Sequence, residues 1–405
     1  MVLQNPLTMK NKLFLIVLVT LYSQLSFAQE PVVFLINAHH IKAKKDAYQK
    51  KDAAAKNQVE LILSKADALL NTKPKSVMDK SSTPPSGSKH DYMSQAPYFW
   101  PDPSKADGIP YIRKDGERNP DIRKITDAAY LHDMTSKCKY LSLAYYFTGR
   151  ESYAAKASEL LNIWFLAAET KMNPNLNYAQ AIPGLNDGRG IGIIESRSLA
   201  ELADWIGLLS GSKALSKDKT EEIKNWYKQY LSWMLNSKNG KDEHHSKNNH
   251  GTIYDAQITS FALFTDQKAL AETTLTESLK RIAVQITPEG QQPLELARTK
   301  AYSYSTMNLN EGWFNLALLG EHAGVDIWNY QTADGKSIRK ALDWLIPYGL
   351  AEKEKTFKQI IPYNSSELYR LLIIAGTEYK NAAYLKQAAS IQKDQETRLT
   401  DLLYN

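Results

Sequence analysis

The stretch AAYLHDMTSKCKYLSLAYYFT-GR-ESYAAKASELLNIWFLAA, residues 128–168, decides the fold class. Apolar residues recur at three- and four-residue steps on both sides of Gly149, which is the spacing of one helix face. Glycine is also the residue that most often ends a helix. The stretch therefore predicts two antiparallel helices joined by a short turn.

The same pattern continues to the end of the chain. Helical runs are expected at about residues 42–70, 195–209, 217–235, 252–264, 267–286, 309–322, 337–345, 366–375 and 382–395. No run alternates with period two for long enough to predict a major sheet. We therefore expect an all-α fold, with about seven antiparallel pairs closing into an incomplete (α/α) toroid around a cleft. An open helical solenoid is the alternative, and the lack of a repeat of fixed period favours the toroid.

Two segments interrupt the helices. Residues 84–121 hold seven prolines and three glycines, through which no helix can persist, and residues 174–192 form a second irregular stretch. Long loops of this kind are often functional, and here they are expected to line the cleft.

The N-terminus has the features of a secretory signal. Lys10 and Lys12 precede an apolar run at residues 13–22, which is too short to span a bilayer, and Ser26-Phe27-Ala28 fits a cleavage site. We expect a signal peptide over residues 1–28, a single domain over residues 29–405, and a periplasmic or secreted protein without a membrane anchor. Cys138 is the one cysteine, so no disulfide can form within the chain.

The net charge of +6 is mild and unclustered, which argues against a nucleic-acid binder and suits a polyanionic ligand. The sequence leaves the oligomeric state open. It also offers no metal site, because the spacing of His244, His245 and His250 matches no standard zinc pattern.

The polar block Asn248-Asn249-His250-Gly251 precedes a helical run, so it lies in a loop or at a helix N-terminus. Helix N-termini expose unpaired N–H groups that attract anions. Asn249 can donate its amide to a carboxylate, and His250 can donate a hydrogen bond or accept a proton. The plainer interpretation is helix capping by Asn248 or Asn249, with a surface histidine.

A second block contains Arg298 and, six residues on, Tyr304. Arginine can hold a carboxylate through two parallel hydrogen bonds. Its charge is also expected to lower the pKa of the Tyr304 phenol and make the phenolate accessible. The plainer interpretation is an ion pair of Arg298 with Glu295, beside two core tyrosines.

Together these groups suit proton abstraction beside a carboxylate. Neutralising the carboxylate of a uronic acid acidifies the hydrogen on C5, so that a base can remove it while an acid protonates the leaving O4. Tyr304 can fill both roles when H5 and O4 lie on one side of the ring. When they lie on opposite sides, His250 can be the base and Tyr304 the acid.

Polar and aromatic residues of the loops are expected to bind the sugar rings and hydroxyls. The candidates for substrate binding are His90, Tyr92, Tyr98, Trp100, Asn177, Gln180, Asn248 and Tyr302. The alternative is that the loop aromatics only anchor the loops to the helices.

These motifs together resemble those of the alginate lyase superfamily of (α/α)-toroid polysaccharide lyases. The chain is more similar to family 38 than to family 5. The resemblance covers residues 90–319, and its carriers are His90-Asp91-Tyr92-Met93-Ser94, Pro97-Tyr98-Phe99-Trp100-Pro101-Asp102-Pro103, Asn248-Asn249-His250-Gly251 and Glu295-Leu296-Ala297-Arg298-Thr299-Lys300. It implies that Asn249, His250 and Arg298 neutralise the carboxylate. It also implies that Tyr304 is the catalytic acid and the base.

The leading hypothesis is a cofactor-independent lyase that cleaves alginate, or a related polyuronate such as glucuronan, by β-elimination. One alternative is a glycoside hydrolase on the same fold, which needs two opposed carboxylic acids; Asp91, Asp187, Glu195 and Glu295 form no persuasive pair in the sequence. The other is a non-catalytic periplasmic protein that binds uronates.

Overall fold

The computed structural model describes residues 30–405. The expected signal peptide, residues 1–28, lies outside the described residues. Residues Val32–Asn405 form one compact unit. None of the helices in the described part of the chain combines the length and apolarity needed to cross a membrane.

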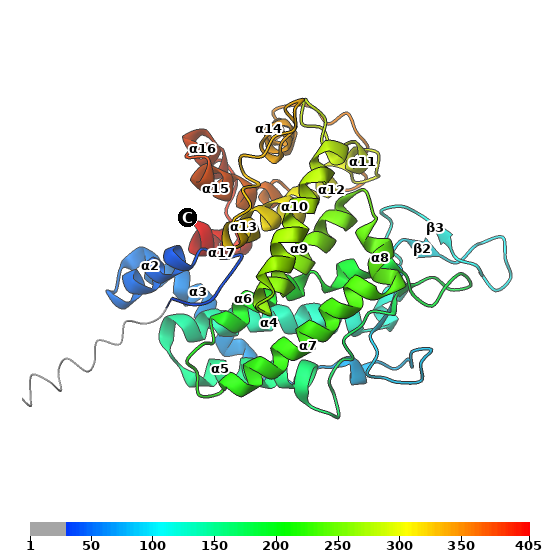
Figure 1. Ribbon diagram of the computed structural model, residues 1–405, viewed down its shortest axis with the longest axis horizontal. Helices are drawn as coiled ribbons and strands as arrows, with labels where there is room; N and C mark the ends of the chain where they lie inside the picture. The colour runs from blue at the N-terminus through cyan, green and yellow to red at the C-terminus, as the bar shows by residue number, and fades with distance from the viewer. Residues whose placement is uncertain (1–29) are drawn as a thin grey trace, which may run out of the picture. The chain divides into compact units, whose positions relative to one another are not determined.

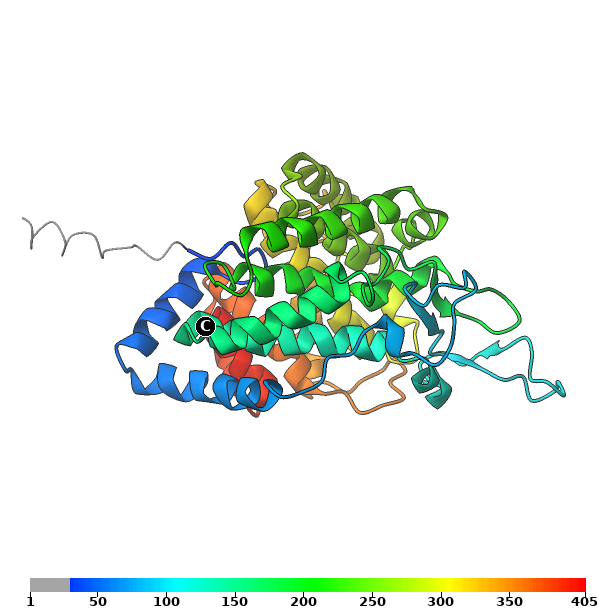
Figure 2. The same cartoon turned by 90° about the horizontal axis from the view of Figure 1, so that it is seen from below.

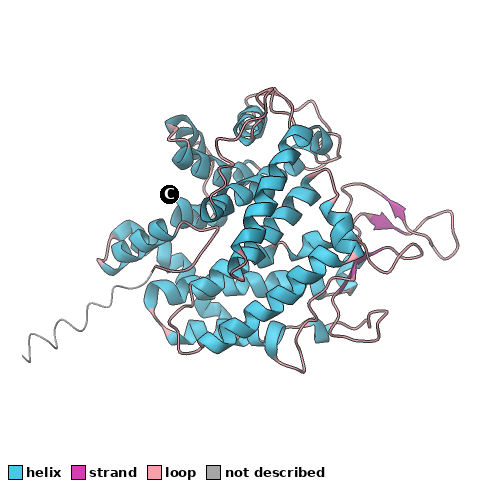
Figure 3. Ribbon diagram, viewed as in Figure 1, coloured by secondary structure: helices cyan, strands magenta, loops and turns pink. Residues whose placement is uncertain are grey.

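Helices dominate this unit, so the expected all-α class is confirmed (Figure 3). The helices are α2 (Ala38–Gln49), α3 (Ala53–Leu69), α4 (Asp127–Thr148), α5 (Glu151–Leu161), α6 (Ser198–Gly207), α7 (Lys217–Asn236), α8 (Lys238–His244), α9 (Asn249–Phe264), α10 (Lys268–Gln285), α11 (Pro293–Leu296), α12 (Ala301–Met307), α13 (Phe314–Ala323), α14 (Ile338–Gly349), α15 (Tyr369–Glu378), α16 (Ala382–Ala389) and α17 (Gln395–Tyr404). The strands are β1 (Met93–Gln95), β2 (Phe99–Trp100), β3 (Ile112–Arg113) and β4 (Tyr178–Ala181).

The helices pack as pairs around an inner set. Contacts pass from α4 to α6, from α6 to α9 and from α9 to α13, while α17 contacts α2 and α3, and α3 contacts α4 (Figure 1). Helix α9 is buried along its whole length apart from His250, whereas its partner α10 buries only one side. A helix that presents no polar face to solvent lies inside, and an amphipathic helix lies outside. The order of contacts is that of an open ring of inner helices with outer partners.

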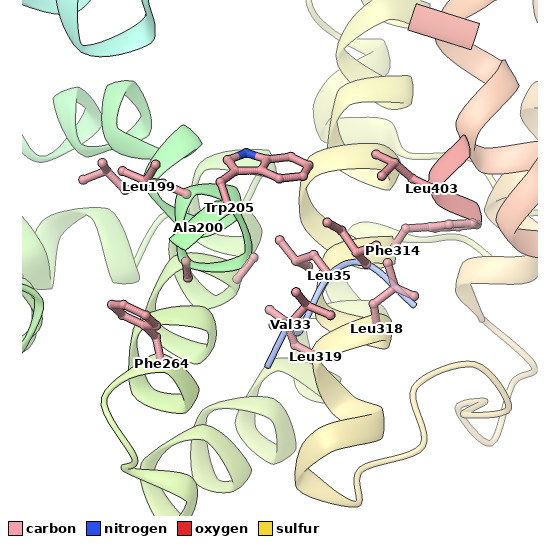
Figure 4. Packing of buried hydrophobic residues seen from close by; sticks show 14 of the residues in the cluster. Val33, Leu35, Leu199, Ala200, Trp205, Phe264, Phe314, Leu318, Leu319 and Leu403 are labelled. Carbon is pink, nitrogen blue, oxygen red and sulfur yellow. The ribbon is translucent and has the colours of Figure 1, made fainter. Parts of the chain in front are cut away.

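The N-terminal stretch before α2 crosses the inner helices. Val33 and Leu35 pack with Trp205, Phe314, Leu318 and Leu403 in the core (Figure 4). The Asp204 carboxylate accepts hydrogen bonds from three successive backbone N–H groups of residues 34–36, at 2.7–2.8 Å. These bonds satisfy the backbone of a segment that has no ladder partner.

The two irregular segments meet at one end of the helices. Strand β1 pairs in parallel with β4, and β2 pairs antiparallel with β3. Figure 2 shows the cyan loop that carries β2 and β3 at the end opposite to the blue helices α2 and α3. The expected loops are therefore tied to each other by short strands, and they form a wall beside the helix ends.

Candidate active site

A cleft of about 1080 Å³ lies between these loops and the inner helices. The helices reach it with their N-terminal turns: Ala128 and Ala129 from α4, Glu201 from α6, His250 from α9 and Arg370 from α15 line it. Helix N-termini carry unpaired N–H groups and the positive end of the helix dipole. Several of them converge on one cleft, which favours a negatively charged ligand.

The charged side chains add a net charge of the same sign, because arginines outnumber the glutamates Glu195, Glu201 and Glu311 in the lining. Of the chain's 50 lysines and arginines, 11 are arginines, and seven of these line the cleft: Arg113, Arg118, Arg123, Arg189, Arg197, Arg298 and Arg370. None of the lysines within residues 30–405 lines it. A guanidinium matches a carboxylate with two parallel hydrogen bonds, whereas an ammonium is a point charge. The exclusive use of arginine therefore points to planar anions such as carboxylates.

The four predicted catalytic residues meet in this cleft. Asn249 and His250 lie in the first turn of α9, Arg298 follows α11, and Tyr304 lies on α12. Three of the predicted binding residues, Tyr98, Gln180 and Asn248, line the same cleft. Asn248 also caps α9, because its side chain accepts from the His250 N–H.

Glu243 fixes the histidine. Its Oε1 lies 2.8 Å from His250 Nδ1, and the carboxylate is 1% exposed. A carboxylate at Nδ1 holds the proton on that nitrogen and leaves Nε2 as the acceptor. The arrangement therefore makes His250 a candidate base with a defined orientation.

Replacing Glu243 with glutamine is expected to lower kcat by roughly 10- to 100-fold, with little change in KM. The glutamine keeps an oxygen near Nδ1 but loses the negative charge that stabilises the imidazolium formed during proton transfer. Steady-state kinetics on a polyuronate measure both constants. Asp242→Asn is the matched control, because Asp242 is on the same helix but pairs with exposed Lys238. A change confined to KM would contradict this role.

Asn249 is held by Glu295. The Asn249 backbone N–H donates to Glu295 Oε1 at 2.7 Å, and the side-chain amide, oriented with its nitrogen toward Glu295, donates at 3.2 Å. Burial raises the pKa of Glu295 to about 7, while the Asn249 N–H and the charges of Arg298 and His250 act in the opposite direction. Glu295 thus holds the first turn of α9, which carries Asn249 and His250. It also accepts a hydrogen bond from the Asn249 side-chain amide, which the sequence analysis assigned to the substrate.

The Glu295 pKa predicts a pH-dependent stability. The folded pKa of about 7 exceeds the unfolded value of about 4.3, so the folded state holds a proton that the unfolded state releases between these values. Stability therefore falls as pH rises through that window. Glu295→Gln is expected to be more stable than the parent by up to about 3 kcal/mol at pH ~8 and equal to it near pH ~4.

Urea unfolding at both pH values measures the effect. Glu272→Gln is the control, because Glu272 is an exposed position on α10. Its replacement should leave the free energy of unfolding unchanged at both pH values. An equal gain at both pH values would contradict the linkage, because a neutral carboxyl and an amide differ little in desolvation.

Arg298 is paired with a carboxylate of the loop wall. Its Nη2 donates to Asp115 Oδ1 at 2.9 Å and its Nε to Oδ2 at 3.2 Å, and Thr299 donates through its N–H and hydroxyl. These donors hold the pKa of Asp115 well below its usual range. The pair ties the loop after β3 to the Arg298 segment. A guanidinium has five N–H donors, so Arg298 keeps donors for a second carboxylate.

Tyr304 lies beside Arg298, with the guanidinium carbon 4.1 Å from the centre of the ring. Its hydroxyl donates to Tyr98 Oη at 2.9 Å. The expectation of a lowered pKa is wrong: burial and the Tyr98 hydroxyl raise the pKa of Tyr304, and the opposing effect of Arg298 is smaller. Tyr304 is therefore a neutral phenol at rest and carries the proton that a general acid has to donate.

Two of the predicted binding residues are in the core. Tyr92 and Tyr302 are both fully buried. The Tyr92 hydroxyl donates to Glu195 at 2.7 Å, and the Tyr302 hydroxyl accepts from the backbone of Thr356 and Phe357. The prediction that they contact substrate is corrected: they support the loops behind the cleft.

Three more are absent from the cleft lining. The ring nitrogens of His90 and Trp100 bond to the backbone carbonyls of Lys171 and Glu117, at 2.7 and 3.0 Å. Asn177 accepts from an indole N–H of α7 at 2.9 Å. These contacts match the loop-anchoring alternative, and they correct the expectation of direct substrate binding in this structure.

Sequence reasoning gave no role to several residues that shape the site. Glu243 lies five residues before Asn248, and Arg189 lies nine residues after Gln180. Nothing else in the sequence points to a role for them in the site. Arg189 donates to the Gln180 side chain at 2.9 Å, and Arg197 pairs with Glu311 at 2.5 Å. Within residues 30–405, no group of three His, Cys, Asp or Glu side chains is arranged to hold a metal ion.

Comparisons with known proteins bear on the family and the fold of the chain. The family model described as Alginate lyase matches residues 76–357, well over half the chain. No curated protein matches it. The chain is similar to the crystal structure of an alginate lyase from Bacteroides ovatus, with 40% identity, a TM-score of 0.88, and coverage of 93% of this chain and 99% of the other.

More distant structures share the fold. Alginate lyase A1-III from Sphingomonas species A1 is 16% identical, with a TM-score of 0.53 over 86% of this chain and 94% of the other. A variant of A1-III complexed with a tetrasaccharide is 15% identical, with a TM-score of 0.60 over 94% and 98%. At this identity the likeness supports the helical toroid and nothing finer.

Proposed function

The chain belongs to the alginate lyase family of polysaccharide lyases, and on that premise we propose that it cleaves alginate, or a related polyuronate such as glucuronan, by β-elimination. The product carries a C4–C5 double bond at its new non-reducing end. The relative from Bacteroides ovatus is described as an alginate lyase, and the A1-III variant binds a tetrasaccharide. Both descriptions support an anionic polysaccharide as the partner.

The observation that carries the proposal is the meeting of Asn249, His250, Arg298 and Tyr304 in an arginine-lined cleft. The substrate carboxylate binds to the free donors of Arg298 and to the Asn249 amide. This binding stabilises the enolate that forms when H5 leaves C5. The C4–O4 bond then breaks as the electron pair forms the C4–C5 double bond, and the Tyr304 hydroxyl protonates O4.

The identity of the base depends on the sugar. In mannuronate and glucuronate, H5 and O4 lie on one face of the ring, so Tyr304 can remove H5 once its own proton has been lost. In guluronate they lie on opposite faces, and His250 Nε2, oriented by Glu243, is the base. The second route needs no prior deprotonation of Tyr304, because the phenol starts as the acid.

The test is ultraviolet absorbance of unsaturated uronate during incubation with polymannuronate, polyguluronate or glucuronan, in the presence of EDTA. A rise on any of them supports β-elimination and names the substrate. New reducing ends without absorbance would replace the lyase with a hydrolase. Binding without any product would leave a uronate-binding protein. Loss of absorbance only when EDTA is present would show that a metal takes part.

We also propose that the protein acts in the periplasm or outside the cell. The proposal is based on the signal peptide expected at residues 1–28. It is also based on the size of the substrate, because a long polymer reaches an exported enzyme before it reaches a cytoplasmic one. Fractionation of the native host with an antibody against the protein tests this, and a cytoplasmic pool alone would contradict it.

A further inference from the structure

A second stretch of the cleft wall is made by residues that no part of the proposed chemistry uses. It runs from the turn before α4 into the first turns of that helix, and we call it the 118–132 wall. Its cleft-lining residues include Arg118, Ile122, Arg123, Ile125, Ala129 and His132. Arginines thus alternate with apolar side chains along one side of the cleft.

Arg118 and Arg123 differ from the other arginines of the cleft. Arg113 and Arg298 pair with Asp115, and Arg197 pairs with Glu311. Arg189 and Arg370 donate hydrogen bonds to Gln180 and to the Asn310 and Asn315 side chains, respectively.

Within the described part of the chain, Arg118 and Arg123 alone among the cleft arginines have neither an ion pair nor a hydrogen bond, and both are exposed. Their full donor sets are therefore available to a ligand.

The backbone between them is firmly placed. Asn119 is buried, its N–H donates to the Pro97 carbonyl at 2.8 Å, and its side-chain nitrogen donates to the Phe99 carbonyl at 2.9 Å. Its side-chain oxygen caps the 3₁₀ turn at residues 120–124. The wall is thus fixed to the strand next to Tyr98, which bonds to Tyr304. The backbone that carries the two arginines is therefore fixed, so that binding a ligand has to order only their side chains.

The apolar residues of the same wall suit a sugar ring. Ile122, Ile125 and Ala129 give aliphatic contact, and pyranose rings present C–H faces to such surfaces. Charged and apolar side chains on one wall of the cleft suit a polymer in which every ring carries one carboxylate.

From this placement we infer that the 118–132 wall is an accessory subsite, in which Arg118 and Arg123 bind the carboxylates of uronate residues other than the one that Asn249 and Arg298 hold. The inference rests on the proposed function and adds a consequence to it. Long substrates gain affinity from the wall, whereas the shortest cleavable oligomers do not reach it. The wall thereby makes the enzyme select for chain length.

The test compares Arg118→Gln/Arg123→Gln with the parent on the substrate identified by the absorbance assay, using the polymer and its size-fractionated oligomers at low salt. KM on the polymer is expected to rise by about tenfold or more, as for lost charge-assisted hydrogen bonds. The kcat and KM on the shortest cleavable oligomer are expected to stay unchanged. Arg118→Lys/Arg123→Lys should recover part of the polymer affinity, because it restores charge without the planar fork.

Lys124→Gln is the matched control. Lys124 lies on the same turn with the same charge, but it pairs with Asp121 at 2.9 Å and does not line the cleft. Equal losses on short and long substrates, or no loss on either, would overturn the subsite and leave the proposed function standing. A parent protein that cleaves no polyuronate would overturn the proposed function itself, and this inference with it.

Discussion

Replacing Tyr304 with phenylalanine is expected to lower kcat on the order of a thousandfold or more, which is the range for loss of a positioned general acid. Binding of the polymer is expected to remain, with Kd changed by less than about threefold. The variant separates the proton donor from the ring that carries it. Turnover is measured by the ultraviolet absorbance of the product and binding by calorimetry.

The contacts of Tyr304 explain why Tyr304→Phe is expected to lower turnover and leave binding unchanged. The Tyr304 hydroxyl bonds to Tyr98 Oη, while the ring packs under the Arg298 guanidinium. Phenylalanine keeps the ring and its cation–π contact. Tyr98 is the hydrogen-bond partner of this hydroxyl, so the removal leaves only the Tyr98 hydroxyl without its partner.

Tyr98→Phe is the control, because it removes the partner hydroxyl and leaves the proposed acid in place. A loss well below that of Tyr304→Phe is expected. Retained turnover in Tyr304→Phe would move the proton transfer to His250, since the nearby Tyr302 is fully buried and bonds to backbone N–H groups.

The helices could be predicted because their signals are local. The expected run at residues 128–148 corresponds to α4, Asp127–Thr148, and Gly149 ends that helix in the left-handed conformation. The next expected helix, residues 151–168, ends early. Helix α5 stops at Leu161 and a π-helical turn follows over Asn162–Leu166, because the apolar pattern gives no information on such a change of pitch.

The four candidate catalytic residues could be proposed from motifs, but the residues that hold them in place could not. Asp115 is 183 residues from Arg298 along the chain, and only the tertiary fold brings the two together. The same holds for the depth at which Tyr304 is buried, which reverses the expected direction of its pKa shift. Periodicity also fails to choose between Tyr302 and Tyr304. Residues two apart on a helix face different sides, and the packing of α14 and the loop at residues 356–357 decides which side is core.

A second large effect is expected from Lys80→Met, which should lower the free energy of unfolding by about 3–5 kcal/mol, as when one partner of a buried ion pair is removed. Lys80 Nζ lies 3.0 Å from Asp127 Oδ2, and both side chains are fully buried. The ammonium also donates to the carbonyls of Val77 and Lys89 at 2.6 Å. Methionine fills similar space but leaves the Asp127 charge without compensation.

Urea unfolding near neutral pH measures the loss, with Lys75→Met as the control. Lys75 pairs with Asp79 at the surface, so its replacement should change stability by less than about 1 kcal/mol.

The double variant Lys80→Met/Asp127→Asn should recover part of the loss, because it removes the uncompensated carboxylate as well. Asp127 also accepts from the Met93 N–H of β1 at 3.0 Å, so loosening of the loop that carries Tyr98 should reduce activity before the protein unfolds.

The pH dependence of this loss identifies its cause. Burial raises the pKa of Asp127 to about 6, with the charge of Lys80 acting in the opposite direction. Without Lys80 that pKa rises further, so lowering the pH neutralises Asp127 in the variant and relieves the unpaired charge. The stability deficit of Lys80→Met should therefore shrink as pH falls from about 8 toward 5. A deficit that is constant over this range would assign the loss to the two carbonyls that no longer receive the ammonium, and the ion pair would have no part in it.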